Sequence, residues 1–311
     1  MAIAASNLGG NSLFARAVAV GAALIIDRVT PEPSNQWHPV AWFGSAMTNV
    51  EQRVWADDRT RGVIYTGLGL TVGALAGSLV RSTGLATLIS LGAGSLRTTA
   101  LQIGEHLEGG DLHAARAALP ALVGRDPSEL DEAGIASAVV ESVAENTVDA
   151  VVAPMFWALT FGAPGALGYR AINTMDAMVG HRSERFEQFG WASARLDDLA
   201  NYLPARLFGL SVLIVRTRRS AAIVHAVSKD APLHPSPNAG VAEAAVAGAL
   251  DVQLGGTLHY GERIEHRPLL GTGSRPDAST IRETVDLVDR AQFALATAAL
   301  LAGILTRTRK A

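Results

Sequence analysis

The 311-residue sequence contains no cysteine, which excludes disulfide bonds, thiolate metal sites and catalysis through a cysteine thioester. Lysine occurs only at Lys229 and Lys310, and neither follows a glycine and precedes Ser or Thr, so the chain has no P-loop. The sequence also lacks an HExxH motif, a GxGxxG turn after a strand, a GxSxG elbow and zinc-ligand spacing. These absences exclude the common covalent, zinc and dinucleotide chemistries.

Charged residues are scarce at 18%, whereas hydrophobic residues make up 49% and the mean hydropathy is +0.22. Soluble domains usually carry nearer 25% charged residues, so the composition favours a membrane protein or a very large buried core. The net charge is −3 and basic residues form only short arginine clusters, which argues against nucleic acid as a partner. Because no charged segment precedes the first apolar run, we expect a retained membrane helix rather than a cleaved signal peptide.

Several apolar runs predict membrane-spanning helices, each of which needs about 20 residues. The run 62–80 is free of charge, and Gly69, Gly73 and Gly77 recur in it at every fourth position, the small-xxx-small pattern of closely packed membrane helices. The other runs are 12–26, 82–96, 150–169, 203–215 and 291–306. Because prolines and glycines interrupt the run 150–169, we expect it to be broken or re-entrant.

Polar, amphipathic helices are expected between these runs. The segment 98–122 predicts a helix interrupted by a turn at Gly109 and Gly110, with a new start capped by Asp111. A further helix is expected with Ser128 before its acidic first turn, and another starting near Ser279. No stretch alternates with period two, so few strands are expected.

The sequence therefore predicts an all-α, polytopic integral membrane helical bundle that forms a single domain over 1–311, with polar and amphipathic helices forming a cytoplasm-facing site. Arginines follow two of the apolar runs, at 216–219 and 307–309, and the positive-inside tendency places both ends in the cytoplasm. The alternative is a soluble helical bundle whose apolar helices form its core.

Three carboxylates in an apolar setting are the first candidate site. Glu141, Glu145 and Asp149 are spaced i, i+4 and i+8, so a helix would stack them on one face, with Asn146 beside them. Like charges at this spacing are destabilising unless a cation or a basic partner neutralises them. A solvated acidic face is the alternative, although the surrounding valines and aromatic residues favour a functional site.

The segment 170–198 supplies cations and further carboxylates. Arg170, Asn173 and Asp176 would share one side of a helix, which Gly180 would end. Guanidinium groups of Arg182, Arg185 and Arg195 could hold phosphates, and a surface ion-pair cluster is the alternative for this loop.

Two adjacent aspartates follow in the same segment. Asp197 and Asp198 are a candidate Mg²⁺ site completed by phosphate and water, and Asp197 would face Asn201.

The segment 234–250 predicts an anion site at a helix start. His234 precedes Ser236 and Asn238, which would lie in or before the first turn, where free N–H groups favour a phosphate. Glu243 would face inward on an otherwise small, apolar helix. The alternative is a capped and tightly packed helix. His38, with Asp27 and Glu32 before it, would form an entry loop.

Three segments carry a family resemblance: ESVAENTVDAVVAPMFW, GYRAINTMDAMVGHRSERFEQFGWASARLDDLANYLPAR and HPSPNAGVAEAAVAGALDVQLGG. They resemble the adenosylcobinamide-phosphate synthase family of cobalamin biosynthesis, known as CobD or CbiB, and the likeness is strongest over 27–271. One departure is visible, since Pro31-Glu32-Pro33 stands where the family usually shows Gly-Asp-Pro.

The resemblance implies a multi-pass enzyme of the cell membrane with a cytoplasmic active site. It would use ATP and Mg²⁺ to join adenosylcobyric acid to (R)-1-amino-2-propanol or its O-phosphate through an amide. Glu141, Glu145, Asp149, Asp197 and Asp198 would divide metal binding and base duties. Arg170, Arg182, Arg185 and Arg195 would hold phosphates, while the segment Ser236–Asn238 would receive the amino-alcohol phosphate.

The expected partners are the corrinoid, the amino alcohol and the lipid bilayer, with a homo-oligomer or a complex with other enzymes of the pathway also considered. Two alternatives remain from the residues themselves. Charges inside broken membrane helices are also typical of a transporter, and a non-catalytic scaffold or sensor related to the synthases would carry the same motifs.

Overall fold

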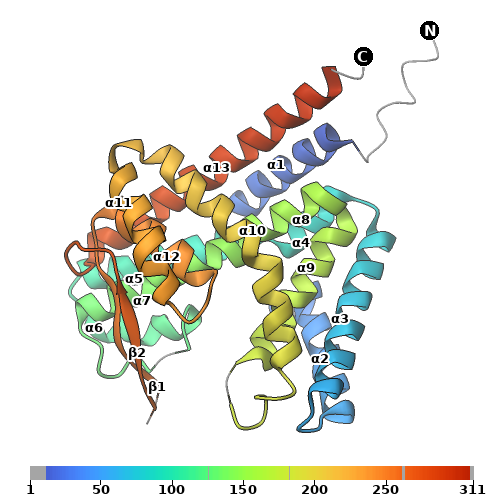
Figure 1. Cartoon of the computed structure of the whole chain (residues 1–311), viewed down its shortest axis with the longest axis horizontal. Coiled ribbons are helices and arrows are strands. Elements are labelled where there is room, and N and C mark those ends of the chain that lie inside the picture. Colours follow the sequence, from blue (N-terminus) through green and yellow to red (C-terminus); the bar gives the residue numbers. More distant parts are fainter. Residues whose placement is uncertain (1–11, 125, 182, 261–262, 309–311) are drawn as a thin grey trace. The chain divides into compact units, whose positions relative to one another are not determined.

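The structure, a computed structural model, describes residues 12–124, 126–181, 183–260 and 263–308 (Figure 1). The chain is mostly helical, as the sequence predicted. Its contacts divide it into two compact units. Among the described residues, the first unit lies within 12–92, 149–201 and 296–308, and the second lies within 93–148 and 202–295. The expected single domain over 1–311 stays a prediction.

The first unit is built from apolar helices with polar caps. Its helices are α1 (Leu13–Val29), α2 (Pro39–Val54), α3 (Arg59–Val80), α4 (Thr83–Ser90), α8 (Ala153–Phe161), α9 (Ala163–Met175), the first part of α10 (Trp191–Val215) and the last part of α13 (Ala278–Thr308). A 3₁₀ turn, Asn35–Trp37, and two π-helical segments, Val148–Val152 and Asp176–Gly180, connect them. The side chains of Ser12, Asp58 and Ser82 accept hydrogen bonds from first-turn N–H groups, which explains where α1, α3 and α4 begin.

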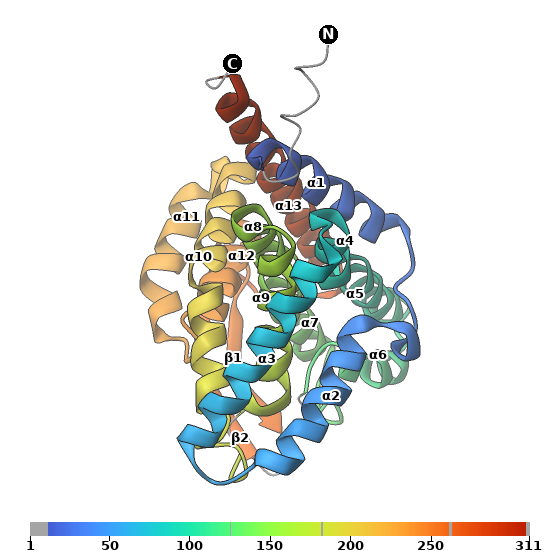
Figure 2. The ribbon, with the colours of Figure 1, turned by 90° about the vertical axis from the view of Figure 1, so that its right-hand side faces the viewer.

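Helix α3 packs closely against α9, and Figure 2 shows the two running side by side. A Cβ added at Gly73 would lie 2.6 Å from the Cβ of Ala171, and one at Gly77 would lie 2.6 Å from the Cα of Pro164. A Cβ at Gly69 would overlap the sulfur of Met175. The small-xxx-small prediction is therefore confirmed, because only glycine permits this approach.

The run 150–169 is broken, as predicted. A π-helical segment precedes α8, and Gly162 separates α8 from α9 with a φ of 69°, a left-handed value that suits glycine. Arg16 of α1 donates hydrogen bonds to the carbonyl oxygens of Leu159 (3.2 Å) and Thr160 (2.6 Å). The charge that interrupts the first apolar run thus satisfies carbonyl groups at the C-terminal end of α8.

The run 82–96 does not form one helix, which corrects its interpretation as a span. Helix α4 covers only Thr83–Ser90, and α5 starts separately at Ala93. The backbone N–H of Gly92 between them donates to Ala150 at 3.1 Å, so the break is held by a distant segment that the sequence could not reveal.

The second unit combines helices with one hairpin. Its elements are α5 (Ala93–Glu108), α6 (Leu112–Ala118), α7 (Glu132–Thr147), the second part of α10, α11 (Ser220–His225), α12 (Ala239–Leu250), β1 (Leu254–Tyr260), β2 (Arg263–Leu270) and the first part of α13 (Ala278–Thr308). Short 3₁₀ turns lie at Leu119–Ala121, Thr217–Arg219 and Ala231–Leu233, and a π-helical segment lies at Ala226–Asp230. The turn at Gly109 and Gly110 and the start of α13 are confirmed.

Two helix caps test the sequence analysis in the second unit. Asp111 accepts a hydrogen bond from the Ala114 N–H at 2.9 Å, which confirms it as the cap of α6. The expected cap at Ser128 is wrong, because the side chain of Asp131 accepts from the Gly134 N–H at 2.8 Å and starts α7.

The hairpin of β1 and β2 is an antiparallel pair that the sequence analysis did not identify. Gly255 and Gly256 have φ values of 84° and 103°, and the strand register is irregular between Leu254 and Gly256. This is the place where a bulge bends β1.

In the described part of the chain, three helices are long and apolar enough to cross a membrane: Arg59–Val80, Trp191–Val215 and Ala278–Thr308. They contain the predicted runs 62–80, 203–215 and 291–306. This finding supports a helical membrane protein.

Candidate functional site

A buried polar network occupies the first unit, and we call Tyr169, Arg170, Asn173, Asp197 and Asn201 the Asp197 network. The side-chain N–H of Asn201 donates to Asp197 Oδ2 at 2.9 Å, and that of Asn173 lies 3.4 Å from Asp197 Oδ1. The hydroxyl of Tyr169 is 2.8 Å from Asn201 Oδ1 and 3.2 Å from the backbone oxygen of Asp149. The predicted facing of Asp197 and Asn201 is confirmed.

Arg170 adds a cation to this network. Its guanidinium donates to Asn173 Oδ1 at 3.2 Å, as the i, i+3 spacing predicted. Its Nε–H is buried and has no hydrogen-bond partner among the described residues. Asp176 follows in the π-helical segment, where a Cβ at Gly180 would overlap its carboxylate.

The two adjacent aspartates have different surroundings. Asp197 is 9% exposed and bound by amides, whereas Asp198 is a third exposed and lies 3.6 Å from Arg195. Neighbouring helical residues point about 100° apart, so the pair does not present one joint face. Among the residues that the structure describes, no group of three or more His, Asp or Glu side chains could hold a metal ion.

The carboxylates of the first candidate site also separate. Glu141 is buried at 5% exposure, and its Oε1 accepts from the Gly255 N–H at 2.9 Å, so it anchors the start of the hairpin. Glu145 is exposed on α7, while Asp149 belongs to the π-helical segment that follows. Glu141 and Glu145 lie one turn apart on α7, as expected, but the expectation that Asp149 continues the same regular helix is wrong, because α7 ends at Thr147.

Asn146 and the loop arginines have partners of their own. Asn146 donates to the backbone oxygen and the hydroxyl of Ser142, at 2.9 and 3.0 Å. Arg185 donates to Glu51 Oε1 at 2.6 Å and lies 4.8 Å from the ring of Trp55. Arg182 lies outside the described residues.

The second unit contains a cluster of ionisable side chains, the His234 cluster, formed by the buried His234 and Glu243 and the half-buried Arg267. His234 Nε2 lies 3.7 Å from Glu243 Oε1 and 2.9 Å from the guanidinium of Arg267. The side chains of His234 and Glu243 are 1% and 4% exposed. The inward orientation of Glu243 is confirmed, whereas Arg267, which β2 supplies, has no sequence signal that links it to His234.

The turn before α12 differs from the predicted anion site. The helix begins at Ala239, and the Ser236 hydroxyl accepts from the N–H groups of Asn238 (3.3 Å) and Ala239 (3.2 Å). The Gly240 N–H donates to the Ser236 oxygen at 3.3 Å. These first-turn N–H groups are bound within the protein, so an anion here would depend on side chains. Arg206 provides one, since it donates to Asn238 Oδ1 at 2.9 Å.

Gly240 permits close packing between α12 and the turn that carries His234. A Cβ at this position would lie 2.6 Å from the Cβ of His234 and 2.7 Å from the oxygen of Ala231. Glycine therefore allows the turn that carries His234 to pack directly on α12.

The entry loop has a simple structure. His38 Nδ1 accepts from the Val40 N–H at 3.2 Å and caps α2, while its Nε2 lies 3.6 Å from Glu32. The carboxylate of the Pro-Glu-Pro sequence thus faces the histidine that follows it.

The class of protein is therefore a mostly helical one that buries ionisable side chains in each unit. Over the described residues, three of its helices are long and apolar enough to cross a membrane. The profile of the CobD/Cbib protein family matches residues 20–288. The chain therefore belongs to the CobD/Cbib family, as the three quoted segments indicated.

Curated relatives agree with this assignment. A protein of Mycobacterium tuberculosis (strain H37Rv) is 45% identical, and the match covers 95% of this chain and 97% of that protein. Relatives from Rhodobacter capsulatus, 44% identical over 77% of this chain and 80% of its own, and Chromobacterium violaceum, 42% identical over 91% and 95%, are also similar. Each is named cobalamin biosynthesis protein CobD, which supports a role in cobalamin biosynthesis. No solved structure matches this chain.

Proposed function

We propose that the chain catalyses ATP-dependent amide formation between adenosylcobyric acid and (R)-1-amino-2-propanol or its O-phosphate. The new C–N bond replaces a C–O bond of one propionate, and the product is adenosylcobinamide or its phosphate. Family membership over residues 20–288 supports this reaction class. The observation that carries the proposal is the His234 cluster, in which the buried His234 and Glu243 lie together and the guanidinium of Arg267 contacts His234, all within the matched residues 20–288.

The His234 cluster and its neighbours would bind the amine. Arg206 donates a hydrogen bond to Asn238, and the guanidinium of Arg267 lies within hydrogen-bond distance of His234 Nε2. Guanidinium groups match phosphate oxygens, so these arginines suit the phosphate of the amino alcohol. Glu243 would accept a proton from the ammonium group, because only the neutral amine is a nucleophile.

The Asp197 network fits a nucleotide-bound Mg²⁺. Such ions use one or two carboxylates together with phosphate oxygens and water, and Asp197 is a buried carboxylate oriented by amides. The buried Nε–H of Arg170, without a hydrogen-bond partner among the described residues, suits a phosphate oxygen. Bound MgATP would supply the phosphoryl group that activates the propionate. Asp197 would hold the ion, and Arg170 would orient the phosphates.

The other residues of the sequence analysis keep smaller roles in this proposal. Glu145 and Asp149 stay candidates for proton transfer, and Arg195 stays a candidate phosphate ligand. Glu141 and Arg185 would act through structure, since they hold Gly255 and Glu51. In this proposal the protein crosses the cell membrane several times, and its active site faces the cytoplasm.

The test is an assay of the purified full-length protein in detergent with adenosylcobyric acid, ATP, Mg²⁺ and either aminopropanol or its phosphate. Mass spectrometry of the corrinoid should show the amide product only when ATP and Mg²⁺ are both present. Absence of product, together with ATP-independent corrinoid flux into vesicles containing the protein, would establish the transporter alternative instead.

One matched pair of variants tests the amine site. Arg206→Gln should raise the KM for aminopropanol phosphate about tenfold or more and leave the KM for aminopropanol nearly unchanged. Arg218→Gln, at an exposed position of the same unit, should change neither KM value.

Glu145→Ala, at an exposed position of α7, should reduce turnover, and unchanged turnover would remove that residue from the proposal.

A further inference from the structure

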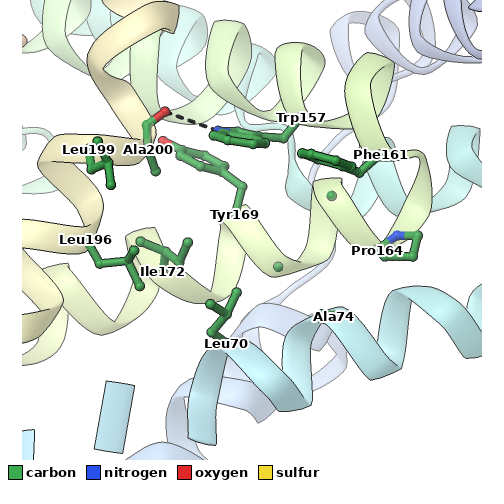
Figure 3. Close-up of a pocket in the computed structure, with 12 residues that line it drawn as sticks. Leu70, Ala74, Trp157, Phe161, Pro164, Tyr169, Ile172, Leu196, Leu199 and Ala200 are labelled. Carbon is green, nitrogen blue, oxygen red and sulfur yellow. Dashed lines mark hydrogen bonds between the residues drawn. The ribbon is translucent and has the colours of Figure 1, made fainter. Parts of the chain in front are cut away.

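The first unit contains an apolar cavity of about 440 Å³ that the amide chemistry does not use (Figure 3). Helices α3, α8, α9 and α10 line it, with Leu70, Trp157, Phe161, Tyr169, Ile172 and Leu199 among the side chains. Its size falls in the range of small-molecule sites, about 300–1,000 Å³.

The polar atoms of the lining side chains are already bound within the protein. The indole N–H of Trp157 donates to the Ala200 oxygen at 3.1 Å, which Figure 3 shows as a dashed line. The hydroxyl of Tyr169 lies 2.8 Å from Asn201 and belongs to the Asp197 network. A polar ligand would lose its hydrogen bonds to water and gain none from these side chains. The chemistry therefore selects a hydrocarbon over a nucleotide, an amino alcohol or the amide-rich rim of a corrinoid.

The cavity opens on a surface that suits lipid. Leu199 and Phe161, which line it, are 72% and 58% exposed. On α3, Leu75 and Leu79 are 58% and 80% exposed, and both α3 and α10 are long enough to span a bilayer. A hydrocarbon environment stabilises such side chains.

The depth of the cavity matches the acyl-chain region. Leu70 and Ala74 lie near the middle of the 22-residue helix α3, which is about 33 Å long at 1.5 Å per residue. If α3 crosses the bilayer, these residues lie near its midplane, where only acyl chains are present.

We propose that this cavity binds one acyl chain of a membrane phospholipid, with the chain lying against Trp157 and Tyr169. The bound chain fills space that would otherwise deprive the lining side chains of contacts. This site is independent of the proposed amide formation, and it would be present in the protein without substrates.

Fluorescence quenching tests the proposal directly. A variant with Phe in place of Trp37, Trp42, Trp55 and Trp191 retains Trp157 as its single indole. In nanodiscs of phosphatidylcholine brominated in mid-chain, Trp157 should be strongly quenched. Ala74→Phe, which fills the cavity, should reduce this quenching at least twofold. Leu75→Phe, at the exposed neighbouring position of α3, should leave it unchanged.

A second measurement uses the protein with all its tryptophans, in case the multiple replacement does not fold. Native mass spectrometry after detergent exchange should detect one retained phospholipid, which Ala74→Phe loses and Leu75→Phe keeps. Equal quenching in all variants, or lipid retained equally by both, overturns the proposal. A dimer that Ala74→Phe dissociates, with no retained lipid, overturns it in favour of a second copy of the chain as the occupant.

Discussion

The two units each bury an acidic side chain, and they do so with different partners. In the Asp197 network the side-chain amides of Asn173 and Asn201 donate hydrogen bonds to the carboxylate. In the His234 cluster the carboxylate of Glu243 lies beside a histidine that also contacts Arg267. The amides fix the orientation of the Asp197 carboxylate, whereas the Glu243 carboxylate lies in a cluster that also contains the guanidinium of Arg267. In the proposed function, the Asp197 network would hold a bound cation, and the His234 cluster would serve proton transfer and anion binding.

The two clusters also differ in how the chain assembles them. Asp197 and Asn201 are one helical turn apart on α10, so local geometry brings them together. His234, Glu243 and Arg267 come from a turn, a helix and a strand, and 33 positions separate His234 from Arg267. The His234 cluster therefore depends on the packing of the whole second unit.

The largest expected effect follows from removing the charge of Glu243. Glu243→Ala would leave the buried His234 and the half-buried Arg267 without this carboxylate, and removing one partner of a buried ionic pair typically costs about 3–5 kcal/mol of folding free energy. Reversible unfolding in detergent micelles measures this loss of folding free energy. Glu283→Ala, at an exposed position of α13, is the control and should change stability by less than about 0.5 kcal/mol. Equal stability of both variants would contradict the difference between the clusters.

The next prediction separates the two adjacent aspartates. The contact of Asn201 Oδ1 with the Tyr169 hydroxyl leaves its amide N–H₂ to donate to Asp197. Asp197→Asn would remove the negative charge and place an amide N–H₂ against the N–H donors of Asn173 and Asn201. We therefore expect amide formation to fall about a hundredfold. Asp198→Asn, which removes a partly exposed charge 3.6 Å from Arg195, should reduce it less than about threefold. Similar losses in the mass-spectrometric assay would show that Asp197 has no special role.

A smaller effect tests the network behind Asp197. Tyr169→Phe would remove the hydroxyl that holds Asn201, at a cost of about 1 kcal/mol. Tyr202→Phe is the matched control, since this side chain is 49% exposed. Denaturant titration of both variants compares them. An equal cost would mean that the Tyr169 hydroxyl adds nothing to the Asp197 network.

Local features of the structure could be predicted from the sequence. The glycines of α3, the break near Pro164, the cap at Asp111 and the inward side chain of Glu243 all follow from spacing within a few residues. The contact between Asp197 and Asn201 belongs to the same group. Each depends on helical periodicity or on a first-turn hydrogen bond, which a sequence records directly.

Distant contacts could not be predicted. Glu141 anchors Gly255, 114 positions away, and Arg185 binds Glu51, 134 positions away. From the sequence, Glu141 is a catalytic candidate because of its spacing from Glu145 and Asp149, and Arg185 is a candidate phosphate ligand in a charged loop. The irregular hairpin was missed for a related reason, since a bulge at Gly255 interrupts the alternation that identifies a strand.

The smallest effect contrasts these buried carboxylates with an exposed one. Hydrogen bonds from the hydroxyl of Ser279, and from the N–H and hydroxyl of Thr280, lower the pKa of Asp277, which lies just before α13. A lowered folded-state pKa means that the stabilisation is complete above the unfolded value, about 3.9, and is lost as pH falls through the folded value. Asp277→Asn should therefore cost about 0.3–1 kcal/mol at pH 7 and almost nothing near pH 2. Asp286→Asn, at an exposed position further along α13, should show no such pH-dependent difference. Unfolding curves at the two pH values decide the point, because a cost that persists in acid would mean that the Asp277 charge does not stabilise the helix.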